Sequence, residues 1–336
     1  MDPPKAFPIL RLSFVPIQEI FKAMNPFEIV NFSMISRRAK AVTMQMTFYS
    51  KYSIQILIGK ELEVTVVGPK YMTQCFYIIT SKEEKSGKIA ENIWNDWKQL
   101  LVWKYSNNLV EEWKQLCIYV LEIFKKQTIR VFSIALDAYV DQNVSIIDFL
   151  KTNVKSVNGC NLDQWEGEND VDEHAAYVLE NIQITFELLL CLHIKSNDFI
   201  LKIPKELMEL TMIKSQWVGY DKLLEIDFKS VILKENEMSD EQWNLYFKKW
   251  ITMETHLNLE HLELDYRDIE EFRALVLHDI PHEVVDRGVK RILKTYCDVK
   301  IEVSGGIDIR RIDGKTATFF FVSWAFQTVN FAMSIH

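Results

Sequence analysis

Hydrophobic residues recur every three or four positions between Pro16 and Phe32, which is the period of an amphipathic helix. Pro16 suits a first helical turn, because its missing N–H would have no partner there. Asn25-Pro26 then ends this helix and opens a second, with Asn25 as N-cap and Glu28 completing a capping box. Ser36 is the expected N-cap of a third helix. Three short helices over about 40 residues are too small to close a core alone, so this segment should need a partner.

After Tyr52 the pattern changes to the alternation typical of β-strands. Three strands are predicted, at residues 53–58, 62–67 and 75–79, and the polar stretch 81–88 that follows is expected to be an exposed loop. Residues 89–105 contain several large aromatic side chains and fit either a strand or a helix, so their secondary structure stays open. Asn108 then caps a predicted helix, whose apolar residues fall on one face that is expected to pack against the core.

From Ile129 onward the chain resembles a degenerate leucine-rich repeat. The repeat pattern of hydrophobic positions starts at residues 129, 189, 207, 228 and 259, and a further repeat is either hidden near residue 154 or badly degenerate. Asn197 and Asn236 stand where the repeat needs a side-chain amide at the turn out of a strand. A helix with Ser239 and Gln242 as capping box is expected over residues 239–251. Stacked units would form a parallel sheet whose exposed strand side chains recognise a target.

The C-terminal part returns to strands, expected at residues 299–303, 307–312, 316–323 and 328–334. Gly305-Gly306 is expected to break the first two, and Asp313-Gly314 predicts a hairpin between the next two. These strands could pair with those of residues 53–79 and so cover a sheet edge.

Composition and charge narrow the classes of function. The chain of 336 residues has a net charge of −8, yet residues 7–47 carry five basic and two acidic side chains. The acidic remainder argues against nucleic acid as the main ligand. The five cysteines are widely spaced, which is typical of reduced thiols in a cytoplasmic or nuclear protein. No segment has the roughly 18 uninterrupted apolar residues that a membrane span needs, so no membrane association is expected.

No catalytic or metal-binding motif stands out. Gly314-Lys315-Thr316 lacks the first glycine and the following helix of a phosphate-binding loop. His278 and His282 have helical metal spacing, but Pro281 breaks the turn between them. Neither a metal nor a cofactor is expected, and the protein is not expected to be an enzyme.

The stretch Phe7 to Val42 resembles an F-box, the motif by which substrate receptors of SCF-type (Skp-cullin-F-box) ubiquitin ligases hold the Skp adaptor. The matching residues are Leu10 and Leu12, Met24-Asn25-Pro26, and Ser36-Arg37-Arg38, whereas Ser13 replaces a usual proline. Asn244 to Ile251 with His256-Leu257, and Asp313 to Thr318, are similar to signatures of the F-box-associated type-two domain of an expanded nematode family.

This resemblance implies a fold and a set of contacts. The expected fold class is α/β, with a small N-terminal three-helix F-box followed by a degenerate leucine-rich-repeat-like strand-helix body with flanking β-strands. The expected domains are an F-box (1–47), β-strands with a polar insertion loop (48–110), a repeat-like F-box-associated domain (111–280) and a C-terminal β-hairpin cap (281–336). The residues expected to contact the adaptor are Leu10, Leu12, Ile20, Phe21, Met24, Pro26, Ile29 and Phe32.

The implied function is substrate recognition within an SCF-type E3 ubiquitin ligase. The chain would bind a Skp-family adaptor, and through it a cullin scaffold, and would hold an unknown target protein nearby. This would raise the effective concentration of the target near the ubiquitin-carrying enzyme, while the chain itself forms no covalent bond. Two alternatives stay open: a non-ligase scaffold that binds the adaptor without delivering a substrate, and an enzyme with a divergent site.

Overall fold

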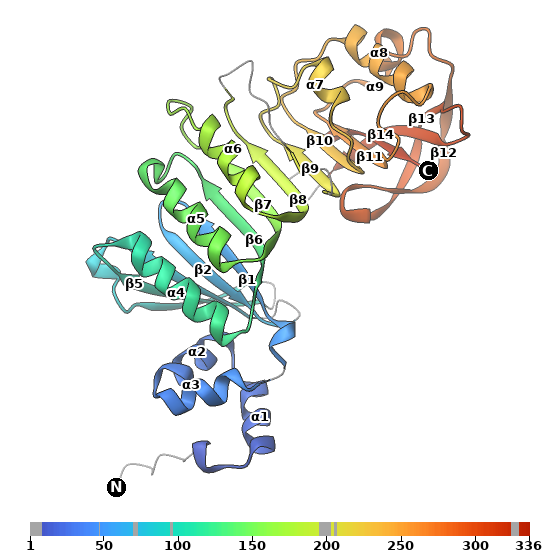
Figure 1. Ribbon diagram of the computed structural model, residues 1–336. Coiled ribbons are helices and arrows are strands. Elements are labelled where there is room, and N and C mark those ends of the chain that lie inside the picture. Colours follow the sequence, from blue (N-terminus) through green and yellow to red (C-terminus); the bar gives the residue numbers. More distant parts are fainter. Residues whose placement is uncertain are drawn as a thin grey trace. The chain divides into compact units, whose positions relative to one another are not determined.

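The computed structural model describes residues 9–46, 48–69, 73–94, 97–194, 203–204, 207–323 and 329–336, without the side chains of residues 48 and 94. Two compact units make up the chain: residues 1–158 with 181–183, and residues 159–180 with 184–336. The described residues contain nine α-helices and fifteen strands, so the protein is mixed α/β (Figure 1).

A mixed sheet forms the centre of the first unit. Its strands are β1 (Ser53–Ile58), β2 (Leu62–Val67), β3 (Thr73–Thr80), β4 (Ile89–Trp94), β5 (Trp97–Tyr105) and β6 (Thr128–Ala135), with the start of β7 (Ser156–Asp163). The strand order is β6-β1-β2-β3-β5-β4. The β1–β6 and β3–β5 pairs are parallel, and the other three pairs are antiparallel. The sequence predicted the first three strands correctly, and residues 89–94 and 97–105, within the stretch that it left open, form β4 and β5.

The described residues of the first unit also form five α-helices and four short 3-10 helices. They are η1 (Ile9–Arg11), α1 (Phe14–Ala23), α2 (Pro26–Met34), α3 (Arg37–Met44), η2 (Phe48–Lys51), η4 (Glu83–Lys85), α4 (Leu109–Ile123), η5 (Val140–Gln142) and α5 (Asn143–Asn153). Helices α4 and α5 lie on the same face of the sheet (Figure 1). The predicted caps are confirmed at Asn25, Ser36 and Asn108, whereas α1 begins two residues before Pro16.

The second unit joins parallel and antiparallel strands. Its strands are the end of β7, β8 (Ile184–Cys191), β9 (Glu209–Met212), β10 (Ser230–Leu233), β11 (His261–Leu264), β12 (His282–Lys294), β13 (Lys300–Arg310), β14 (Thr316–Ser323) and β15 (Val329–Ile335). The order is β12-β13-β14-β15-β11-β10-β9-β8-β7. Strands β8 to β11 are parallel neighbours, and β11, β15, β14, β13 and β12 pair antiparallel.

An aromatic core lies between the helices and strands of the second unit. The helices are α6 (Asp172–Asn181), α7 (Tyr220–Leu224), α8 (Asp240–Ile251) and α9 (Ile269–Leu275), with the 3-10 helix η6 (Tyr296–Asp298). Residue Asn181 of α6 belongs to the first unit. Phe247 of α8 contacts Phe272 of α9 and Phe319 of β14, with ring centroids 5.9 Å and 5.1 Å away. The predicted capping box at Ser239 and Gln242 is confirmed.

The predicted fold class is wrong. Three short helices do lie between Phe14 and Met44, but the N-terminal unit extends to residue 158 and is built on strands, not on a separate three-helix F-box. Short helices bury too little surface among themselves, so α2 and α3 pack on β3 and α4. The body is also not a repeat with flanking strands, because the C-terminal strands continue the same sheet as β8 to β11.

Two predictions for the C-terminal strands are wrong as well. Residues 300–310 form one strand, although its pairing with β12 shifts register between Val285 and Lys290, opposite Gly305. Strand β15 pairs with β11 and β14, so the C-terminal strands do not pair with residues 53–79. The hairpin at Asp313-Gly314 is confirmed: Arg311 N donates to Lys315 O over 2.9 Å, and Gly314 has a φ of +92°.

Candidate partner-binding surface

Helices α1 and α2 are held together by an aromatic contact. Phe21 of α1 meets Phe32 of α2 edge to face, with ring centroids 5.1 Å apart, and Phe21 is fully buried. Arg38 at the start of α3 donates from Nη2 to Leu10 O over 2.9 Å, which ties the segment before α1 to α3. The three helices therefore share one small core.

The same helices are fixed to α4 by polar contacts. The hydroxyls of Ser33 and Tyr119 lie 2.8 Å apart. Lys40 Nζ lies 2.6 Å from Glu122 Oε2 and 4.9 Å from the centroid of the Tyr119 ring. One face of the helical segment is thus covered by the protein's own chain, and a partner would have to bind elsewhere on the segment.

The residues expected to contact an adaptor differ in exposure. Four are buried in the first unit: Phe21, Pro26, Ile29 and Phe32. The other four are half-buried: Leu10, Leu12, Ile20 and Met24. The structure therefore leaves only part of this predicted set accessible.

Different apolar residues of the helical segment are exposed. Phe14 and Val15 in the first turn of α1 are 46% and 66% exposed, and Met34 and Ile35 at the end of α2 are 56% and 72% exposed. Sequence reasoning missed Phe14 and Val15 because it started the helix at Pro16. The sequence could have indicated that Met34 and Ile35 are exposed, since they precede the N-cap Ser36 and lie outside the row of apolar residues that α2 buries.

The repeat-like strands do not present the exposed face that the sequence suggested. All residues of β9, β10 and β11 are buried. The tip of the β12–β13 hairpin covers part of this face: Cys297 N and Sγ donate to the Glu209 carboxylate over 2.8 and 3.1 Å, and Tyr296 OH donates to Glu187. Target recognition by a row of open strand side chains is therefore wrong for β9 to β11.

One of the two turn asparagines has the predicted role. Asn236 Nδ2 donates to Ser215 O and Val218 O over 3.2 and 3.0 Å, and its Oδ1 accepts from Met238 N over 3.1 Å. The amide thus satisfies three backbone groups where β10 ends. Asn197 lies outside the described residues.

Asn244, inside the segment similar to the F-box-associated signature, also has a structural role. Its Nδ2 donates to Val276 O over 2.7 Å and to Asp279 Oδ1 over 2.8 Å, and the residue is buried. These bonds tie α8 to the turn after α9, as expected for a packing signature.

The two histidines considered as metal ligands both bond to the backbone. His278 and His282 each donate from Nδ1 to a backbone carbonyl, of Leu275 and Ile280. Burial lowers the pKa of His256 to about 4, and burial together with the Glu209 contact raises the pKa of the Cys297 thiol to about 12. Within the described residues, no group of three or more His, Cys, Asp or Glu side chains could hold a metal ion.

Comparison with known families identifies one region of the chain. A family model described as F-box associated matches residues 198–264. The matched segment contains β9, α7, β10, α8 and β11, together with Asn236 and Asn244. No curated protein matches the chain. None of the helices in the described ranges combines the length and the apolar character needed to cross a bilayer.

Proposed function

We propose that this protein is a substrate-recognition subunit of an SCF-type ubiquitin ligase. In this role, helices α1 to α3 bind a Skp-family adaptor, a cullin scaffold joins through the adaptor, and the rest of the chain holds a target protein. The match of residues 198–264 to the F-box-associated family carries the proposal. The likeness of residues 7–42 to an F-box and the exposed apolar residues of α1 and α2 support it.

The proposed mechanism is proximity. The chain performs no chemistry itself and acts by raising the effective concentration of the target near the ubiquitin-carrying enzyme. Such a role suits a protein in the cytoplasm or nucleus, where the adaptor and scaffold are expected.

The test is adaptor binding by surface variants. Val15→Asp places an acidic residue in the first turn of α1, where the helix dipole favours it, and Ile35→Asn changes an exposed residue at the end of α2. We expect the double variant to fold normally and to lose at least tenfold in affinity for a purified Skp-family adaptor. Ile93→Asn is the matched control, because Ile93 is 75% exposed on β4 of the same unit.

Two outcomes would overturn the proposal. The first is no adaptor binding by the folded natural chain, and the second is an equal loss of affinity in the Ile93→Asn control. If the adaptor binds, proteasome inhibition in cells separates a ligase subunit from a scaffold. Co-purified partners accumulate in ubiquitinated form only when the chain delivers substrates.

A further inference from the structure

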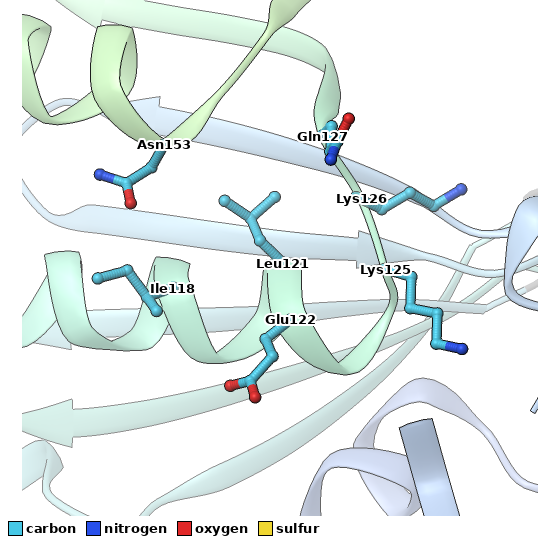
Figure 2. A pocket seen from close by; sticks show the side chains of 7 residues that line it. All are labelled: Ile118, Leu121, Glu122, Lys125, Lys126, Gln127 and Asn153. Carbon is cyan, nitrogen blue, oxygen red and sulfur yellow. The ribbon is translucent and has the colours of Figure 1, made fainter. Parts of the chain in front are cut away.

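A groove lies between α4 and α5 in the first unit. Ile118, Leu121 and Glu122 of α4, the turn residues Lys125 to Gln127, and Asn153 of α5 line a cavity of about 450 Å³. Figure 2 shows Leu121 rising from α4 towards the side on which Asn153 projects from α5, while both lysine side chains leave the turn on one side. Ile118 is 47% exposed, so the groove has an apolar wall open to solvent.

The end of α4 sets the direction of these lysines. Lys125 adopts a left-handed backbone with a φ of +50°, and Lys126 N donates back to Leu121 O over 2.9 Å, which closes the helix. The chain then turns into β6. Both lysines are thereby held at the rim of the cavity by the backbone rather than by a long mobile loop.

A second cavity extends the groove. It measures about 390 Å³, and its lining includes Ser50, Thr128, Arg130 and Asn158. Lys126 and Gln127 line both cavities, so the two lie next to each other at the turn between α4 and β6. Two adjoining open cavities suit an extended chain better than a small ion.

The lining is basic although the protein as a whole is acidic. It contains Lys125, Lys126 and Arg130 against one carboxylate, Glu122, whose Oε2 is already 2.6 Å from Lys40 Nζ. The contact of Lys126 Nζ with Ser50 O is long, at 3.4 Å, and burial lowers the pKa of Lys126. A carboxylate beside this ammonium group would be favoured by the charge and would replace lost hydration.

We propose that this groove binds an acidic, extended peptide segment of a partner protein, with carboxylates at Lys125 and Lys126 and an apolar side chain against the exposed Ile118. The site is separate from the exposed apolar residues of α1 and α2, and the proposal does not require the ligase role. Nucleic acid fits less well, because the one aromatic residue in the lining, Tyr52, is buried and cannot stack on a base.

The experiment measures direct binding to the full-length chain. The probe is a fluorescent ten-residue peptide of two Asp-Glu-Leu-Glu-Asp repeats, followed by fluorescence anisotropy at two salt concentrations. We expect Lys126→Gln to weaken binding at least fivefold and the Lys125→Gln, Lys126→Gln double variant to weaken it further. Ile118→Glu should also weaken binding, and because Ile118 is half exposed this change should leave the fold intact.

The controls distinguish binding in the groove from nonspecific attraction between the acidic peptide and basic surface residues. Lys88→Gln removes the same charge from an exposed position just before β4 and should leave the affinity unchanged. A peptide with Ser in place of every acidic residue should not bind. The proposal is overturned if the acidic peptide does not bind the folded chain, if Lys88→Gln weakens binding as much as Lys126→Gln, or if only RNA or anionic vesicles bind at this groove.

Discussion

The amide of Asn236 allows a sharp test of how the matched region is held together. Replacing Asn236 by Ala removes two donations, to Ser215 O and Val218 O, and one acceptance, from Met238 N. Each such bond contributes about 0.5 to 1.5 kcal/mol net, and the site is half-buried, so water replaces part of the loss. We expect Asn236→Ala to lower the free energy of unfolding of the second unit by about 2 to 3 kcal/mol.

A second substitution at this site keeps the shape of the side chain and removes its hydrogen-bond donors. Asn236→Asp keeps the shape and can still accept from Met238 N, but at neutral pH it points a carboxylate at two backbone carbonyls. We expect it to destabilise at least as much as Asn236→Ala, because charge repulsion is added to the lost donations.

The assay should report on the second unit alone, because two units need not unfold together. Hydrogen–deuterium exchange of peptides covering β10 and α8 provides this. Asn258→Ala is the control, since the exposed Asn258 makes a long contact of 3.4 Å to Asp227. The proposed role of the Asn236 amide would be refuted if Asn236→Ala lowers the free energy of unfolding by less than about 0.5 kcal/mol, or if Asn258→Ala lowers it equally.

Three further predictions concern single sites. Phe21→Ala should destabilise the first unit by about 3 to 5 kcal/mol in urea unfolding, because Phe21 is fully buried; a small effect would show that its contact with Phe32 contributes little. The pKa of folded His256 is about 4 and the unfolded value is about 6.5, so the unfolded state binds the proton first. The contribution of His256 to stability should therefore fall between about pH 7 and pH 4 and stay constant below pH 4. His256→Asn, which tolerates the left-handed backbone, should flatten this pH profile, and an unchanged profile would contradict the assignment. Gly306→Ala should lower the melting temperature, because φ is +119° and a Cβ would lie 2.7 Å from Phe319 O, whereas Gly219→Ala, with open space, should not.

Buried residues of the predicted adaptor contacts are unsuitable for testing the proposed adaptor binding. A combined Phe21→Ala and Pro26→Ala change would remove side chains that the first unit buries. Lost adaptor binding would then report unfolding as readily as a lost contact. Val15 and Ile35 avoid this ambiguity because both side chains are largely exposed.

Local structure was predicted well where a few neighbouring residues decide it. The capping boxes at Asn25 and Glu28 and at Ser239 and Gln242 are present, since each requires only two side chains and two backbone groups three residues apart. Alternation likewise located β1 and β2 to the residue, because both strands lie between short turns.

The candidate surfaces could be predicted only in part. The basic character of residues 7–47 was visible, but Lys125, Lys126 and Arg130 attract no notice in a generally charged sequence. Only the fold brings them together: the turn after α4 places Lys125 and Lys126 in the lining of the cavity beside Ile118, and Arg130 of β6 lines the second cavity, which shares Lys126.

The sequence by itself determined the caps, the hairpin at Asp313-Gly314, most strands and the turn asparagine at 236, because each depends on interactions within one or two turns of chain. The tertiary structure alone decided that β15 pairs with β11, that the hairpin tip at Cys297 covers Glu209, and that Phe21 is buried while Ile35 is exposed. Such long-range pairings depend on which surfaces remain unburied once every element has formed. That competition involves the whole chain, and no local pattern records its result.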